Sequence, residues 1–289
     1  MELKKKTIES PNYSIVVPGR CNAACNFCFW DRNVDLSPMY LPNLRESLGN
    51  MPPQFHQISI TGGEPTLSHL LADVLTTIDT DKYNHVVFTT NGKNILPFAD
   101  YLQRLGAHIN ISRHAIGDER NATIFKSDSV PKAKDLEKIC EELNNRGIDV
   151  TFNAVLAGGI KTKNDVLDYI KFAKDSGASA VCFRKRHGTL TPTPLERGFD
   201  QIQSREYKCP VCRSKTQIIK GMKTIWKASV EEPSVNLGMV YEVIYHPDGR
   251  LTEDWAGKKE VEFKGKPQKN KQDHRVVEVD HGTGNCGHC

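Results

Sequence analysis

The sequence has no long hydrophobic run. No apolar stretch approaches the roughly 18 to 20 residues that a membrane-spanning helix needs. The first residues, MELKKKTIES, carry charge without the apolar stretch of a signal peptide. Hydrophobic residues make up 38% and charged residues 26% of the chain, a balance typical of a packed globular protein. We therefore expect no membrane partner and a cytoplasmic location.

The chain also has little net charge and no internal repeat. A formal charge of +4 is too small to indicate a nucleic-acid-binding protein by itself. A length of 289 residues suits one large domain with an appendage, or two modest domains. Periodicity breaks after about Thr189, where TPTPLERGFDQ begins a polar connection. We predict a first domain at residues 1–200 and a smaller module at 201–289.

Short runs rich in β-branched residues predict six strands in the first domain, at Tyr13–Val17, Gln57–Thr61, His85–Thr90, His108–Ser112, Asp149–Val155 and Ala180–Arg184. Helical periodicity lies between them and is clearest in Lys132–Arg146 and Asn164–Ser176. Alternating strands and helices with short connections indicate βαβ units and a parallel sheet. We predict an α/β fold whose sheet curls into a barrel, with functional loops at the carboxyl ends of the strands.

Nine cysteines in a chain without an export signal argue for metal or redox chemistry and against a disulfide framework. Seven are clustered and two are solitary. The solitary ones are Cys140, on a helical pattern, and Cys182, in an apolar strand. Because a solitary cysteine is among the most often buried residues, we predict that both serve packing.

The sequence CNAACNFC places Cys21, Cys25 and Cys28 directly after the first predicted strand. Cysteine thiolates hold the irons of iron–sulfur clusters, and a four-iron cluster with three protein ligands leaves one iron open to an exogenous chelate. A structural zinc ion would require four ligands, and no fourth is nearby. The motif therefore predicts a reactive cluster.

This arrangement resembles the CxxxCxxC motif of the radical S-adenosylmethionine (SAM) superfamily, including the aromatic residue, Phe27, before the last cysteine. A second likeness is Gly62-Gly63-Glu64-Pro65 at the end of the second strand, which resembles the GGEP motif of that family. The resemblance implies a partial (β/α)6 barrel and a [4Fe–4S] cluster that binds SAM and cleaves it to methionine and a 5′-deoxyadenosyl radical. It assigns Gly62, Gly63, Glu64 and Pro65 to SAM.

Weaker likeness continues along the barrel. Thr90 and Asn91 resemble the TNG-type end of the third strand, and Ser112 lies where relatives often have a serine that meets SAM. Asn153 and Arg184 fall where relatives line the SAM or substrate pocket. The acidic residue that often follows the serine is absent, since Arg113 and His114 stand there. We expect these two side chains to face substrate instead.

The second module carries two CxxC pairs, Cys209/Cys212 and Cys286/Cys289. They bracket a β-hairpin predicted from Gly238–His246 and Arg250–Trp255 around a Pro247-Asp248-Gly249 turn. Four thiolates make a closed site, which by spacing alone suits zinc. The resemblance favours a twitch-like module with a second, auxiliary [4Fe–4S] cluster, and zinc is the alternative.

The substrate is the least determined part of the prediction. Arg184-Lys185-Arg186-His187 follows the sixth strand, where guanidinium groups could hold phosphate or carboxylate. We expect a small anionic, nucleotide-like substrate, with a flavodoxin- or ferredoxin-type electron donor implied by the family. The alternatives are a peptide-modifying maturase, although no leader-peptide domain is recognisable, a non-catalytic iron–sulfur redox protein, and a zinc-dependent nucleic-acid-binding tail.

Overall fold

The computed structural model describes residues 2–3, 7–28, 36–186, 194–199, 207–208, 214–227, 240–261 and 263–264. The strands are β1 Glu2–Leu3, β2 Thr7–Val17, β3 Gln57–Gly62, β4 His85–Thr90, β5 His108–Ser112, β6 Val150–Val155, β7 Ala180–Arg184, β8 Tyr207–Lys208, β9 Lys215–Ile219, β10 Met222–Lys227, β11 Val240–Tyr245, β12 Leu251–Thr252 and β13 Phe263–Lys264. The helices are α1 Tyr40–Asn50, α2 Leu71–Thr77, α3 Ala99–Arg104, α4 Asp118–Phe125, α5 Ala133–Asn145, α6 Lys163–Asp175 and α7 Pro194–Arg197, with 3-10 turns η1 Pro65–Leu67 and η2 Leu96–Phe98.

Strands β2 to β7 form the centre of the main sheet in chain order, each parallel to the next. At least one helix lies between each pair in the sequence, so the predicted βα alternation and the partial barrel are confirmed. All six predicted strands are present, and β2 begins six residues earlier than predicted. Because the strands are parallel, their carboxyl ends meet at one edge of the sheet, where the loops with the predicted motifs begin.

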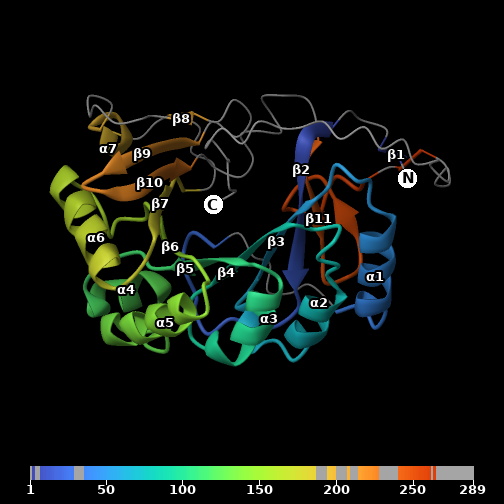
Figure 1. Cartoon of the computed structure of the whole chain (residues 1–289), viewed down its shortest axis with the longest axis horizontal. Coiled ribbons are helices and arrows are strands. Elements are labelled where there is room, and N and C mark those ends of the chain that lie inside the picture. The colour runs from blue at the N-terminus through green and yellow to red at the C-terminus, as the bar shows by residue number, and fades with distance from the viewer. Residues whose placement is uncertain are drawn as a thin grey trace.

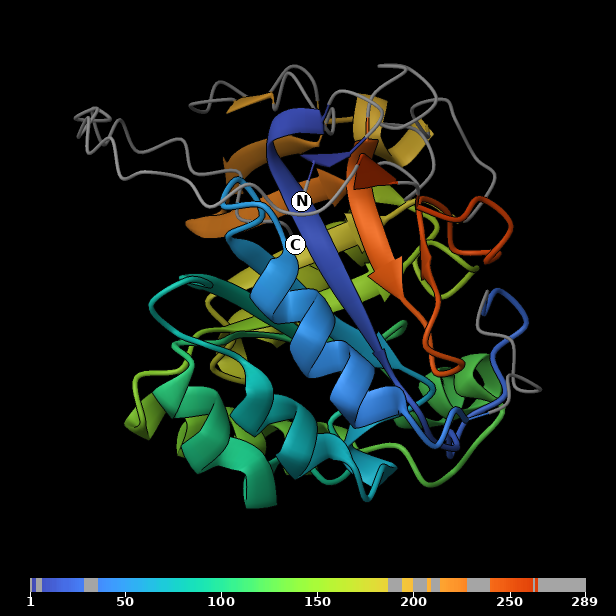
Figure 2. The same ribbon diagram turned by 90° about the vertical axis from the view of Figure 1, so that its right-hand side faces the viewer.

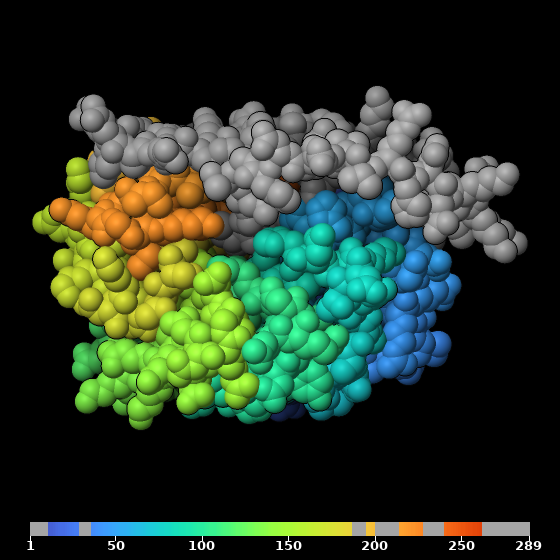
Figure 3. Space-filling model, in the orientation of Figure 1, coloured from blue at the N-terminus to red at the C-terminus, as the bar shows by residue number. Residues whose placement is uncertain are grey.

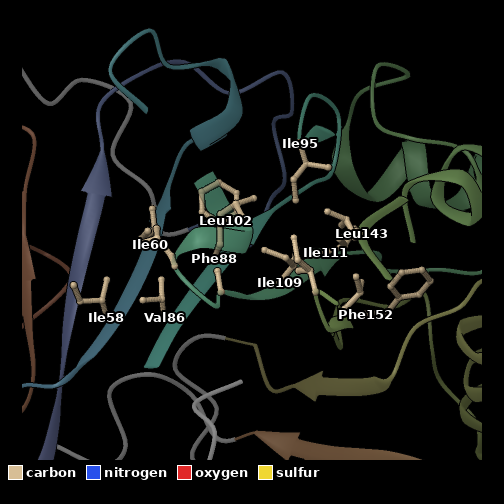
Figure 4. Close-up of a cluster of buried hydrophobic side chains, with 14 of the residues drawn as sticks. Ile58, Ile60, Val86, Phe88, Ile95, Leu102, Ile109, Ile111, Leu143 and Phe152 are labelled. Atoms are coloured by element: carbon tan, nitrogen blue, oxygen red, sulfur yellow. The ribbon is translucent and has the colours of Figure 1, made fainter. Parts of the chain in front are cut away.

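The helices cover one face of this sheet and form an arc around it (Figure 1). In the space-filling view the segments coloured from yellow-green to blue make a continuous outer surface over the strands (Figure 3). Every second strand side chain packs into this layer, including Ile58, Ile60, Val86, Phe88, Ile109, Ile111 and Phe152 beside Ile95, Leu102 and Leu143 (Figure 4). Burial of these side chains, worth about 1.5–3 kcal/mol each, holds the helices on the sheet.

The opposite side of the strands from β2 to β6 is mostly polar. Strand side chains alternate between faces, so the neighbours of the core residues point the other way, and we call this side the inner face. Its polar side chains on β2 to β6 are Asn12, Ser14, Gln57, Ser59, Thr61, His85, Thr89, His108, Asn110, Ser112, Thr151 and Asn153. Several of them are only half-buried, so the inner face is not packed like the core.

Strands that follow β7 in the sequence extend the same sheet at both of its ends. Strand β10 lies parallel to β7 and is paired with β9, while β11 lies parallel to β2 and is paired with β12. Figure 2 shows β11 in orange beside the long blue strand β2. The predicted hairpin is confirmed, with Gly249 at φ +87° in its turn. The domain boundary near residue 200 stays a prediction.

Two further predictions are confirmed. Helices α5 and α6 begin and end within one residue of the predicted ranges. Cys140 and Cys182 are each 0% exposed, as expected of packing residues. Among the described residues, no helix is long and apolar enough to span a membrane.

Candidate functional site

The loop after β2 carries the three clustered cysteines. It is tied to the end of α4 by a hydrogen bond from the Ala24 N–H to the Phe125 carbonyl (2.7 Å). Cys21 and Cys25 are half-buried and pack beside an apolar cluster of Ala23, Phe125 and Val130, whereas Cys28 is exposed. The Cys28 N–H donates to the Cys25 carbonyl (3.2 Å), which turns the chain between them. The loop is thus anchored at Ala24, between Cys21 and Cys25, and Cys28 beyond it is exposed.

The two glycines at the end of β3, Gly62 and Gly63, let this loop lie against the strand end. A Cβ atom at Gly62 would lie 2.5 Å from the Val17 carbonyl oxygen. One at Gly63 would lie 3.1 Å from the Arg20 carbonyl oxygen and 3.3 Å from the Cys21 Cβ. Gly63 therefore supports the position of Cys21, and a side chain there would displace a cysteine as well as block the approach of a ligand.

Glu64 is a buried junction between two loops. Its side chain is 2% exposed, and both carboxylate oxygens accept hydrogen bonds. Oε1 accepts from the Thr66 N–H (3.2 Å), the Thr66 hydroxyl (2.7 Å) and the Thr90 hydroxyl (2.5 Å), and Oε2 from the Asn91 N–H (2.6 Å). Burial raises the pKa of Glu64, and these four donors oppose the rise. Its side chain positions the loops after β3 and β4, and Pro65 begins the 3-10 turn beneath it.

Asn91 connects the loop after β4 to the cysteine loop. Its Nδ2 donates to Asn22 Oδ1 (2.6 Å), and its Oδ1 accepts from the Lys93 N–H (3.0 Å). Asn22 in turn bonds Ser129 through its side chain and its backbone carbonyl. Sequence reasoning did not identify Asn22 or Ser129, because their roles depend on partners from other loops. Asn22 stands at an x position of the CxxxCxxC motif, and Ser129 belongs to no motif.

The remaining predicted residues lie along the same edge. Ser112 and Asn153 are register partners on β5 and β6, and Arg184 ends β7 opposite Val155. Asn153 is 4% exposed, and its Oδ1 has no hydrogen-bond partner in the described part of the chain. A buried acceptor without a donor costs about 1–3 kcal/mol, so such a group calls for a ligand or an ordered water.

The expectation that Arg113 faces substrate is wrong, and that for His114 stays a prediction. Arg113 is 1% exposed and turns toward α4, where it donates to the carbonyls of Ala115 (2.7 Å), Pro131 (3.1 Å) and Ile116 and pairs with Asp118 (2.7 Å). These contacts satisfy the guanidinium group and fasten the loop after β5. The sequence could not show this, because most of these acceptors are backbone carbonyls.

His114 is buried between two aromatic rings. Its ring centroid lies 5.0 Å from that of Phe27 and 4.6 Å from that of Phe125. Nδ1 accepts a hydrogen bond from the Val155 N–H (3.1 Å), which places the ring proton on Nε2. Burial and the neighbouring Arg113 lower the pKa of His114 to about 3, so the ring is neutral. It supports the cysteine loop through Phe27.

The three cysteines of the loop are a donor set for an iron–sulfur cluster, in which each thiolate binds a different iron. Three cysteines on one loop, the close approach at Gly63 and the buried acceptor of Asn153 on the same edge suit a cluster that takes an exogenous ligand.

The four cysteines predicted to hold a second metal, Cys209, Cys212, Cys286 and Cys289, lie outside the described residues. Both hairpins that flank the barrel are described, but neither contains a cysteine. The second metal centre therefore stays a prediction.

Comparison with known proteins agrees with this geometry. The sequence profile of the radical SAM superfamily matches residues 15–173, more than half of the chain. A probable GTP 3′,8-cyclase of Methanothermobacter marburgensis is 24% identical over 170 residues, which cover 57% of this chain and 54% of that protein. The GTP 3′,8-cyclase of Limosilactobacillus fermentum is 26% identical over 168 residues, covering 56% of this chain and 50% of that protein. The alignments thus span about half the length of these relatives.

Solved structures show the same fold. Streptococcus suis SuiB superposes with a TM-score of 0.59 at 13% identity over 86% of this chain and 61% of SuiB. Its complex with the precursor peptide SuiA gives a TM-score of 0.53 at 17% identity over 62% of this chain and 40% of that one. With the family's cysteine and glycine motifs brought together at the carboxyl ends of a partial barrel, the chain belongs to the radical SAM superfamily of enzymes.

Proposed function

We propose that this enzyme uses a [4Fe–4S] cluster on Cys21, Cys25 and Cys28 to cleave SAM reductively and abstract a hydrogen atom from a small anionic, nucleotide-like substrate. The cluster and SAM, when bound, supply the 5′-deoxyadenosyl radical. The observation that carries the proposal is the convergence of the cysteine loop, the Gly62–Pro65 turn and the Thr90–Asn91 turn through Gly63, Glu64 and Asn91. Rearrangement or oxidation of the substrate would follow.

The residues around this edge have separate roles in the proposal. Gly62 and Gly63 expose backbone to the SAM methionine, while Ser112 and the unpartnered oxygen of Asn153 hydrogen-bond SAM from β5 and β6. Glu64, Pro65, Thr90 and Asn91 keep the loops in place. Arg184, half-buried at the end of β7, faces the anionic part of the substrate or of SAM.

An anionic substrate is supported by the basic residues after β7 and by the GTP 3′,8-cyclase relatives. Within the predicted basic run, Lys185 lies 3.8 Å from Glu196 and is partly neutralised, whereas Arg186 is exposed. The likeness to SuiB is one of fold, so no specific observation favours the peptide-modifying alternative. We propose a flavodoxin- or ferredoxin-type protein as the electron donor, in keeping with the family.

The test is the production of 5′-deoxyadenosine by anaerobically reconstituted protein with dithionite, SAM and GTP. We expect GTP to increase the rate, because substrate captures the radical, and deuterium from labelled GTP to enter 5′-deoxyadenosine. The triple alanine variant of Cys21, Cys25 and Cys28 should form none, whereas Cys140→Ala, a change of a packing cysteine on helix α5, should retain activity. Equal yields from the triple variant would refute the cluster assignment, and no effect of GTP would refute the nucleotide substrate.

We further propose that Cys209, Cys212, Cys286 and Cys289 hold an auxiliary [4Fe–4S] cluster, with zinc as the alternative. Two CxxC pairs supply four thiolates, which make a complete ligand set for either metal. Wild type should contain about eight irons, and the variant lacking the first three cysteines about four. Deleting Gly287–Cys289 should lower the iron content of the protein only if Cys286 and Cys289 bind the metal. One equivalent of zinc beside four irons would overturn the cluster in favour of zinc.

A further inference from the structure

The inner face of the barrel carries a second buried acceptor without a donor. Asn110, on β5, is 1% exposed, and its Oδ1 has no hydrogen-bond partner among the described residues. It lies two residues before Ser112, so it is one step deeper into the barrel than the predicted SAM residues. Within the described residues, no hydrogen bond joins the Asn110 side chain to the cysteine loop or to the loops after β3 and β4. The SAM assignment leaves this oxygen unexplained.

A cation lies at the same level of the sheet. The register joins Asn110 to Thr151, Thr151 to Ala180, and Ala180 to Lys223, so one row crosses β5, β6, β7 and β10. Three strand spacings of about 4.8 Å separate the ends of this row along the sheet. Between Thr151 and Lys223 the row has the small, buried side chain of Ala180.

Lys223 is directed over the inner face. It lies close enough to His85 and His108, on β4 and β5, to lower the pKa of both histidines. Its side chain is exposed, and in the described part of the chain it makes no ion pair. Because burial also lowers the pKa of both histidines, with that of His108 reaching about 4, neither ring supplies positive charge at neutral pH. Within this row of described residues, Lys223 is therefore the cationic side chain that could bind an anion.

We propose that Asn110 and Lys223 form a substrate subsite on the inner face, in which Lys223 binds the anionic group and Asn110 accepts a hydrogen bond from a hydroxyl or amino group of the same molecule. This inference rests on the proposed function. It narrows the substrate class to anions that also carry hydrogen-bond donors away from the anionic group. The ribose hydroxyls and the base amino group of a nucleotide are such donors.

The test measures equilibrium binding by anaerobic calorimetry of the full-length, reconstituted enzyme with SAM. GTP offers both an anion and donors, whereas inorganic tripolyphosphate offers the anion alone. Asn110→Val should weaken GTP binding about five- to tenfold, the value of one hydrogen bond, and leave tripolyphosphate binding unchanged. Lys223→Gln should weaken both ligands by a similar factor. Lys220→Gln, on the exposed β9–β10 turn, is the matched control for charge.

The melting temperature of the protein without ligand separates ligand binding from structure. Valine is close to asparagine in size and suits a strand, so removing an unpaired buried oxygen should leave the melting temperature equal or higher. A lower melting temperature of Asn110→Val, or GTP binding by this variant equal to that of wild type, would overturn the subsite. If GTP binds wild type but tripolyphosphate does not, the role of Lys223 is overturned. If neither ligand binds wild type, the nucleotide proposal fails and the subsite with it.

Discussion

Gly63 and Cys21 are coupled at the scale of single residues. The 3.3 Å between a Cβ at position 63 and the Cys21 Cβ is tighter than most real contacts, and the Arg20 carbonyl is closer still. The sequence motif assigns Gly63 to SAM alone, so from the motif a Gly63→Val change would weaken SAM binding without affecting the thiolates. The structure revises this expectation, because valine would push on the backbone that holds the first cysteine.

Gly63→Val should therefore lower both the iron content after reconstitution and the affinity for SAM. The added Cβ meets backbone atoms of Arg20, which cannot move aside as a flexible side chain would. Gly49→Val is the matched control, because a Cβ at Gly49 has nothing within 4 Å. Iron analysis and SAM titration check both quantities, and a folded Gly63→Val protein with full iron content would contradict the coupling.

His108 should make stability depend on pH. Burial lowers its pKa to about 4; Lys223 and His85 contribute to the lowering, and Asp149 opposes it. Its Nε2 bonds the Thr151 hydroxyl at 2.8 Å. Between pH 6.5 and 4 the unfolded chain binds a proton at this residue that the folded chain does not, so the free energy of unfolding falls as the pH falls. The loss is at most about 1.4 kcal/mol per pH unit.

Urea denaturation of the apo-protein at pH 7 and pH 5 measures this effect. His108→Gln cannot titrate, so its free energy of unfolding should fall less between the two pH values than that of wild type. His69→Gln, at an exposed position, should keep the wild-type difference. The same pH difference in His108→Gln as in wild type would show that burial of His108 does not contribute.

Helix α6 illustrates stabilisation at the scale of an element. Thr162 Oγ1 accepts from the Asp165 N–H (3.1 Å), and Asp165 Oδ2 accepts from the Thr162 N–H (2.9 Å), a complete capping box. The helix packs Val166, Tyr169 and Ile170 against the sheet. The cap sets where the helix begins, and the buried stripe sets which face meets the strands.

Thr162→Ala should lower the free energy of unfolding by about 1 kcal/mol, the usual value of an N-cap side chain. Thr162→Ser keeps the accepting hydroxyl and should lose much less. Urea denaturation of the three proteins provides the comparison. Because this helix end has no part in the proposed site, SAM affinity should be equal in all three proteins. A stability loss in Thr162→Ser equal to that in Thr162→Ala would contradict the capping role.

At the scale of the whole molecule, strands from the last third of the chain extend both ends of the barrel sheet. Strand β11 lies parallel to β2, where Glu242 Oε1 accepts from Asn12 (2.8 Å) and Ser14 (2.5 Å), and its Oε2 accepts from Trp255 (3.0 Å). Val243, Ile244 and Tyr245 are each at most 1% exposed. This segment therefore belongs physically to the barrel sheet, even though the sequence composition changes before it.

Ending the chain after Lys227 should destabilise the barrel by at least about 3 kcal/mol, since it uncovers β2 and exposes several large apolar side chains. Ending it after Val261 keeps β11 and β12 and should have a much smaller effect. Thermal and urea denaturation of the two truncated proteins give the comparison. Unchanged stability of the shorter one would favour an independent module beginning near residue 200.

The sequence by itself determined the barrel strands, the helices α5 and α6, the hairpin around Pro247-Asp248-Gly249, and the motifs at Cys21–Cys28 and Gly62–Pro65. These depend on local properties: the alternation of apolar residues, turn chemistry and the spacing of ligands along the chain. They can be identified without knowing which parts of the chain become neighbours.

Only the tertiary structure decided which side chains serve the site and which serve the fold. Arg113 follows Ser112 directly, but its bonds to carbonyls of other loops bury it away from the inner face. Asn22 belongs to the site because Asn91 donates a hydrogen bond to it. Asn110 is identified by its side-chain oxygen, which has no hydrogen-bond donor among the described residues. The physical reason is that a hydrogen bond or an ion pair depends on the position of both partners, and strand register and loop packing bring together residues far apart in the sequence.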